Sequence, residues 1–162
     1  MSDEELRNLI GGDGSVFYSA ASFLAVAFFV MAAILNRKLE GNKWSPFVVM
    51  PIGIIGSLML YASSWSTTIC GWIAGFLNGV GAMFGGDMPV NAIMGIVCII
   101  AMVATIVDLW FDAGYNAAAV WALIIAPIAA QGAAGGVGGF VNGAYSALTI
   151  GAIKLVTEAF GA

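Results

Sequence analysis

Few side chains in this sequence could take part in ionic or acid–base chemistry. The chain has 162 residues, with five Lys and Arg, nine Asp and Glu, and no His. Asp108 and Asp112 are the only carboxylates between Asp87 and Glu158. Acidic side chains in an apolar segment are costly to bury and often serve ion or proton transfer, so this pair is a possible ion or proton site. The alternative is that both lie within a turn of a helix end, where water reaches them.

Four uncharged polar side chains form a second candidate group. Asn142, Ser146 and Thr149 recur at the spacing of one helical face, and Asn78 occupies the place of Asn142 in a related segment. Such side chains either line a polar lumen or form hydrogen bonds between helices. In membrane proteins these bonds contribute on the order of 0.6 kcal/mol each. The sequence leaves both roles open.

Enzyme and metal chemistry have little support. The chain contains no G-x-S-x-G, H-E-x-x-H or P-loop motif, so we expect no enzymatic activity, no catalytic residue and no cofactor. Asp108-x-x-x-Asp112 resembles the last carboxylate pair of the CDP-alcohol phosphotransferase motif, but the rest of that motif is missing. Cys70 and Cys98 lie in apolar runs, where Cys usually behaves as a small hydrophobic residue. No metal site is expected.

The polar residues lie beside a segment that occurs twice. Residues 71–79 read GWIAGFLNG and residues 135–143 read GGVGGFVNG, so both follow G-x-x-x-G-F-(L/V)-N-G at a spacing of 64 residues (135 − 71). On a helix, glycines four residues apart share a face and let another backbone approach closely. We call these the zipper segments. Their predicted helix-packing or oligomerisation residues are Gly71, Gly75, Gly79, Gly135, Gly139 and Gly143. Packing within one subunit is the common use of such a face, and packing between subunits is the alternative.

The composition is that of an integral membrane protein. Hydrophobic residues make up 61% of the chain and charged residues 9%, and the mean hydropathy is +0.99. Charge-free runs cover residues 14–36, 44–86, 88–107 and 113–153, and a helix needs roughly 20 apolar residues to cross the hydrocarbon core. The sequence therefore predicts an all-α, polytopic membrane protein.

Four crossings follow from the apolar runs, at residues 16–35, 46–62, 90–111 and 117–130. The polar run 63–68 is predicted to lie at the outer interface. The stretches 69–84 and 135–160, which contain the zipper segments, either cross the membrane, re-enter it or lie at its surface. We thus expect four to six short transmembrane helices, with a possible internal repeat of 16–86 and 90–160 built around the two zipper segments. Six crossings would make the halves inverted, and four would make two parallel hairpins.

Residues 1–15 are predicted to form an N-terminal interfacial helix or tail, and 16–162 a single membrane domain. Arg37, Lys38 and Lys43 are three of the five basic residues, so the positive-inside rule places loop 36–45 in the cytoplasm and the N-terminus outside. We expect the protein to be encoded by a bacterium or a phage and to lie in the inner or plasma membrane.

Three functions fit this architecture. The first is a homo-oligomer that forms a pore, channel or translocation conduit in the lipid bilayer. It resembles phage holins, which are small, multi-spanning and packed through small residues, although holins commonly end in a basic tail. The second is a structural or accessory subunit, scaffold or pilin-like, of a larger secretion or conjugation machine. The third is a small ion-coupled transporter with Asp108 as its coupling site. A net charge of −4 without clustered Lys and Arg argues against nucleic-acid binding.

Overall fold

The computed structural model describes residues 15–40, 42, 45–108 and 116–160. This part of the chain is entirely helical, as expected, and has no strand. The predicted N-terminal helix and Asp112 lie outside the described residues. The six helices are α2 (Ser15–Lys38), α3 (Ser45–Ala62), α4 (Ser64–Met83), α5 (Val90–Val107), α6 (Ala117–Gly132) and α7 (Gly135–Phe160).

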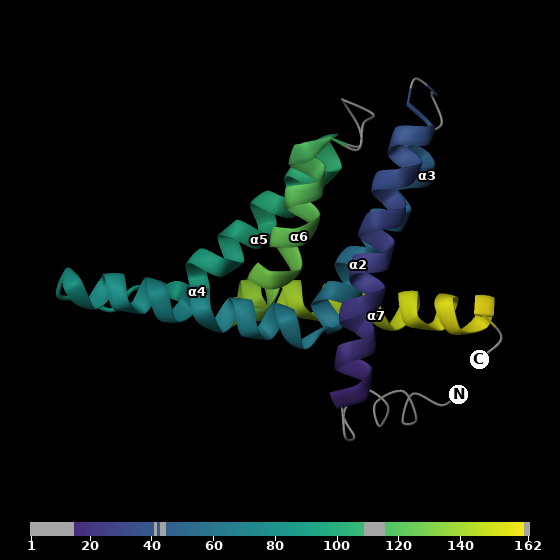
Figure 1. Cartoon of the computed structure of the whole chain (residues 1–162). Helices are drawn as coiled ribbons and strands as arrows, with labels where there is room; N and C mark the ends of the chain where they lie inside the picture. The colour runs from purple at the N-terminus through teal and green to yellow at the C-terminus, as the bar shows by residue number, and fades with distance from the viewer. Residues whose placement is uncertain (1–14, 41, 43–44, 109–115, 161–162) are drawn as a thin grey trace.

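Four of the helices form two hairpins. Helix α2 packs against α3, and α5 against α6, in pairs that stand upright in Figure 1. Close approach of α2 to α3 depends on Gly56, because a Cβ atom there would lie 3.2 Å from the Cβ of Phe28. The hairpins meet through α3 and α6, where Val49 and Met50 share a buried apolar cluster with Leu123. The two pairs therefore share one core.

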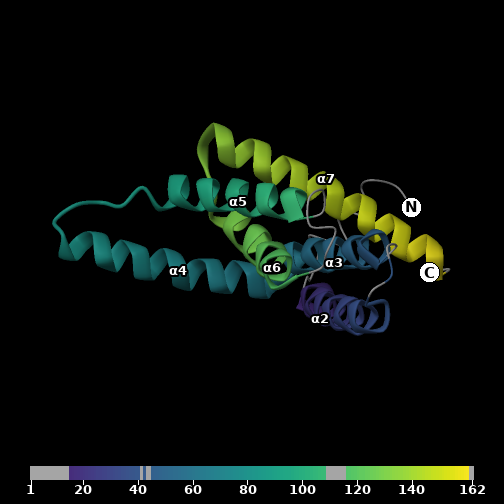
Figure 2. The same ribbon diagram turned by 90° about the horizontal axis from the view of Figure 1, so that it is seen from above.

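Helices α4 and α7 lie across the hairpins. In Figure 1 they run horizontally at the lower end of α3, α5 and α6, α4 to one side and α7 to the other, in roughly opposite chain directions. Seen from above in Figure 2, they flank the hairpins, with α4 along one side and α7 along the opposite side. The chain order is thus hairpin, crosswise helix, hairpin, crosswise helix.

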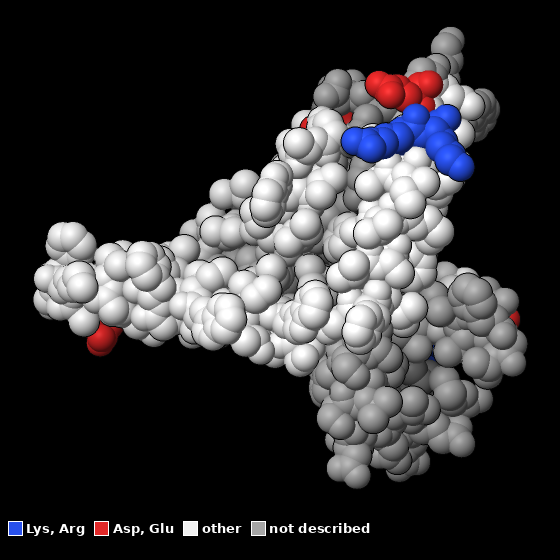
Figure 3. Space-filling view, viewed as in Figure 1, with Lys and Arg blue, Asp and Glu red and all other residues white. Residues whose placement is uncertain are grey.

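The hairpin helices have the dimensions of membrane crossings. Three helices are long and apolar enough to cross a membrane, in the windows Ala21–Lys38, Ser45–Ala62 and Val90–Val107, and α6 is a shorter apolar helix. Eighteen helical residues extend about 27 Å, close to the thickness of the hydrocarbon core. Figure 3 shows charged side chains at the upper ends of the hairpins and at the far ends of the crosswise helices, with an uncharged surface between them.

One predicted boundary was wrong. The first zipper helix was expected to begin at residue 69, after the polar run 63–68, but α4 begins at Ser64 and runs for 20 residues. Ser66, Thr67 and Thr68 each donate a side-chain hydrogen bond to a backbone carbonyl three or four residues earlier, at 2.8–2.9 Å. Because these hydroxyl groups bond within the helix, they do not compete with it.

Candidate functional site

The zipper faces point away from the rest of the chain. A Cβ atom added at Gly75 of α4 or at Gly139 of α7 would meet nothing within 4 Å, and the same holds for Gly71, Gly79 and Gly143. The two helices bury their other sides, through residues such as Cys70 in α4 and Tyr145 in α7. Within the described residues, the zipper faces therefore contact no other helix of the subunit.

Large aromatic side chains stand beside these glycines. Trp72 and Phe76 of α4 are 72% and 70% exposed, and Phe140 of α7 is 77% exposed. On both crosswise helices, the zipper glycines thus form a groove, and the exposed aromatic side chains beside them form a ridge. Helices α4 and α7, which carry these surfaces, lie on opposite sides of the α5–α6 hairpin in Figure 2.

Gly135 differs from the other zipper glycines. Its φ angle is 76°, in the left-handed region that residues with a side chain rarely adopt. Gly135 is also the first residue of α7, so it makes the turn between α6 and α7. The α7 zipper face therefore rests on Gly139 and Gly143.

Other glycines do make the close contacts within the subunit. A Cβ at Gly132 would lie 2.8 Å from Sγ of Cys70 and 3.0 Å from Cγ of Met94, so Gly132 lets the end of α6 approach α4 and α5. A Cβ at Gly138 would lie 2.5 Å from the carbonyl carbon of Ala133. Gly138 therefore permits the tight connection from α6 into α7.

The most connected polar side chains lie where α3 turns into α4 and α6 turns into α7. The Tyr61 hydroxyl donates to Oδ1 of Asn142 at 3.2 Å, and Nδ2 of Asn142 donates to the Ala133 carbonyl at 3.2 Å. Nε2 of Gln131 donates to the Tyr61 carbonyl at 2.8 Å. The Tyr61 and Tyr145 rings stack with centroids 5.0 Å apart. We call Tyr61, Gln131, Asn142 and Tyr145 the corner cluster.

Two serines extend the corner cluster. The Tyr145 side chain lies beside Ser57 of α3, which is 3% exposed. Oγ of Ser66, in the first turn of α4, donates to the Tyr61 carbonyl at 3.1 Å. The cluster therefore ties α3, α4, α6 and α7 together at one place.

Of this cluster, sequence reasoning had singled out only Asn142, which forms a bond between helices rather than part of an open lumen. A usable signal was present, because Tyr61 and Gln131 are the polar residues that end two otherwise apolar helices. Helix ends leave backbone carbonyls without partners, and polar side chains placed there can supply them.

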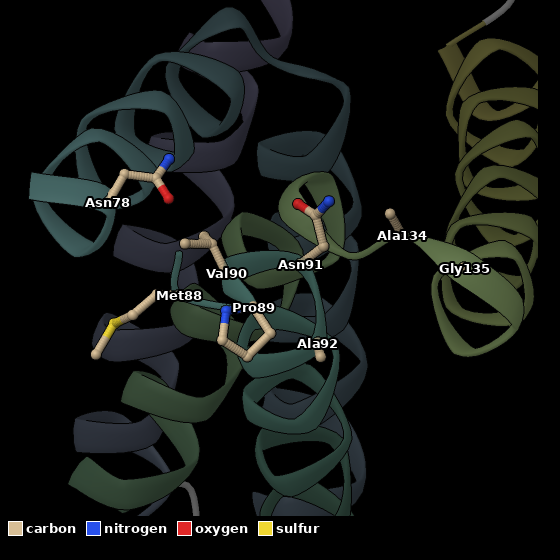
Figure 4. A pocket seen from close by; sticks show the side chains of 8 residues that line it. All are labelled: Asn78, Met88, Pro89, Val90, Asn91, Ala92, Ala134 and Gly135. Atoms are coloured by element: carbon tan, nitrogen blue, oxygen red, sulfur yellow. The ribbon is translucent and has the colours of Figure 1, made fainter. Parts of the chain in front are cut away.

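Asn78 occupies the same motif position as Asn142 but has a different environment. Its side chain is exposed and forms no hydrogen bond with the described residues. It lines an open pocket of about 450 Å³ at the start of α5. Figure 4 shows Asn78 and Asn91 on either side of Val90, with Ala134 and Gly135 at the far end. The two copies of the motif thus use one residue type in two ways.

The remaining predicted residues are not brought together. Ser146 is exposed on α7, whereas Thr149 is 5% exposed and its hydroxyl oxygen has no hydrogen-bond partner among the described residues. Asp108 caps the C-terminal end of α5, far along the chain from both. Its Oδ2 is buried and has no partner in the described part of the chain. The described residues contain no group of three His, Cys, Asp or Glu that could hold a metal ion.

No protein-family model, curated protein or solved structure matches this chain. Its function has to be argued from its own residues.

Proposed function

We propose that this protein is a self-assembling membrane subunit whose copies join through the zipper faces of α4 and α7 to build a conduit through the bilayer. The observation that carries this proposal is the outward direction of both faces. Glycine faces stabilise contacts between membrane helices by letting backbones approach closely, and here no helix of the described chain covers them.

The placement of the faces favours joining α4 of one copy to α7 of the next. Two different faces on opposite sides of a subunit form a head-to-tail interface, which gives a closed ring when the rotation between copies closes and an open row when it does not. With Gly75 opposite Gly139, the aromatic ridges of one helix lie beside the glycine groove of the other. A closed ring of such subunits, lying in the membrane plane, encloses a passage that runs across the bilayer.

A structural or accessory subunit of a larger membrane machine is the second candidate. It is favoured by the inward position of Asn142 and Thr149. Of the four polar residues predicted to line a lumen, only Asn78 and Ser146 are exposed. In that case a partner protein covers the same two faces, and the purified subunit does not close into a ring.

The mass of the purified protein in nanodiscs tests self-assembly. We expect the wild type to give one discrete oligomer, and Gly75→Leu and Gly139→Leu to give smaller particles, because a bulky side chain keeps the backbones apart. Both positions have room for a side chain within the subunit, so the fold is retained. Ala27→Leu, at an exposed position on α2, is the matched control and leaves the oligomer unchanged.

Disulfide cross-linking tests the head-to-tail arrangement. Copies carrying Gly75→Cys are mixed with copies carrying Gly139→Cys, with Cys70 and Cys98 replaced by Ala in both. We expect cross-linked dimers in the mixture and few with either variant alone. Cross-linking of Gly75→Cys with itself would instead indicate a two-fold interface, and a monomeric wild type would favour the accessory subunit.

A further inference from the structure

Tyr61 connects both zipper helices to the hairpins. Its carbonyl oxygen accepts from Gln131 of α6 at 2.8 Å. Oγ of Ser66 in α4, whose shorter hydrogen bond goes to the Ser63 carbonyl at 2.8 Å, lies 3.1 Å from the same oxygen. Its hydroxyl donates to Asn142 of α7 at 3.2 Å, and its ring stacks on Tyr145 of α7. One residue of α3 therefore contacts three other helices.

The two crosswise helices differ in which parts of them are buried against the rest of the subunit. Helix α7 is held at the corner by Asn142 and by the buried residues Val141 and Tyr145. Helix α4 is buried in its first half at Ser66 and Cys70, while Met83 at its end is 85% exposed. In its second half, Gly81 packs against the loop that follows α4. Ala74 and Leu77 of α4 also pack against the main core cluster. The first turn of α4 is the part that lies beside Tyr61, through Ser66.

We propose that Tyr61 is a positioning residue that holds α7 at a fixed orientation relative to α3 and α6, and thereby relative to α4 of the same subunit. This inference rests on the proposed assembly. In a head-to-tail assembly, the angle between the two faces of a subunit decides whether the copies close and how many do so. The corner cluster, which includes Asn142 beside Gly143, thereby sets the size of the ring.

Distance measurements between spin labels within one subunit test this orientation. Labels are attached to Met83→Cys on α4 and Leu155→Cys on α7, both exposed, with Cys70 and Cys98 replaced by Ala. Labelled copies are diluted into unlabelled protein, so that only distances within a subunit are recorded. We expect one narrow distance distribution in the otherwise wild-type chain.

The test variant is Asn142→Leu combined with Gln131→Leu, which removes the side-chain bonds of both residues while keeping the size of the side chains. We expect its distance distribution to broaden and shift. The matched control is Asn78→Leu, at the same position of the other motif copy, and its distribution stays narrow. If the double variant does not yield folded protein, Tyr61→Phe, which keeps the ring stacking, is measured instead. A narrow, unshifted distribution in the folded variant overturns the proposal.

The assembly provides a second readout that separates the two proposals. In the variant, the Gly75→Cys and Gly139→Cys cross-link still forms because the faces are intact, but the discrete oligomer becomes a mixture of sizes. Loss of the cross-link in the otherwise wild-type chain counts against the assembly itself. If the cross-link forms normally in the variant and the discrete oligomer is unchanged, the proposed role of Tyr61 is wrong. The proposed assembly is not affected by that result.

Discussion

At the residue scale, the glycines of this chain have two different roles. Those of the zipper motif have open space where a Cβ would be, whereas Gly132 and Gly138 lie against other atoms of the subunit. The sequence motif identified the first group by its spacing. It could not identify the second, because a glycine required by a distant neighbour such as Cys70 has no local signature.

Replacing one glycine of each kind separates these roles. We expect Gly132→Ala to lower the free energy of unfolding by about 1–3 kcal/mol, since its Cβ would overpack against Cys70 and Met94. Gly75→Ala should change it by less than about 1 kcal/mol, in the stabilising direction, because alanine favours a helix over glycine. Unfolding by SDS in mixed micelles, at a protein concentration where the chain is monomeric, measures both. An equal loss in the two variants would contradict the distinction.

The two motif asparagines show a further limit of sequence reasoning at this scale. Asn78 and Asn142 have the same neighbours in the motif, yet only Asn142 meets the Tyr61 hydroxyl. That contact joins residues 81 positions apart in the sequence. It depends on how α7 lies across α3, which the motif does not specify.

At the element scale, the apolar runs predicted the hairpin helices closely. Helix α3 begins and ends within one residue of the predicted 46–62, since Pro46 and the serines after Ala62 mark its ends. The start of α4 was missed because hydroxyl side chains are ambiguous. They favour turns when they bond to nearby backbone outside a helix, and they are tolerated when they bond to the preceding turn, as Thr67 and Thr68 do.

The depth of α4 in the bilayer is a prediction at this scale. Helix α4 lies across the ends of the hairpins, about 27 Å from their charged tips, so Trp72 should lie near the headgroups rather than in the middle of the bilayer. We expect its fluorescence, with the other four Trp replaced by Phe, to be quenched more by lipids brominated near the headgroup than by those brominated near the chain ends. Stronger quenching by the deep label would indicate that α4 crosses the membrane.

At the scale of the whole molecule, the distribution of charge follows the hairpins. Arg37 and Lys38 end α2, and Asp108 caps α5, so these three charges lie at the loop ends of the two hairpins. Asp87 follows α4, and Lys154 and Glu158 lie in the last part of α7. The sequence alone could not choose between four and six crossings, because the glycine-rich helices are apolar enough for either position. We propose four crossings, because α4 and α7 run across the ends of the hairpins (Figure 1).

Cysteine labelling in intact cells tests this topology. Asp87→Cys and Glu40→Cys are made with Cys70 and Cys98 replaced by Ala, and a membrane-impermeant thiol reagent is added outside. With four crossings and the basic loop in the cytoplasm, we expect Asp87→Cys to react and Glu40→Cys to be protected until the cells are lysed. With six crossings both positions are cytoplasmic, and neither reacts before lysis.

The placement of the two zipper faces on different helices, α4 and α7, has a consequence for how the proposed head-to-tail assembly is halted. Every unfinished row of copies has one end that offers α4 and another that offers α7. A subunit carrying Gly75→Leu still adds through its intact α7 and then offers the next copy nothing to bind. A small proportion of the variant therefore stops the growth of many rows. We expect it to reduce the assembly of co-expressed wild-type protein by more than its share of the mixture.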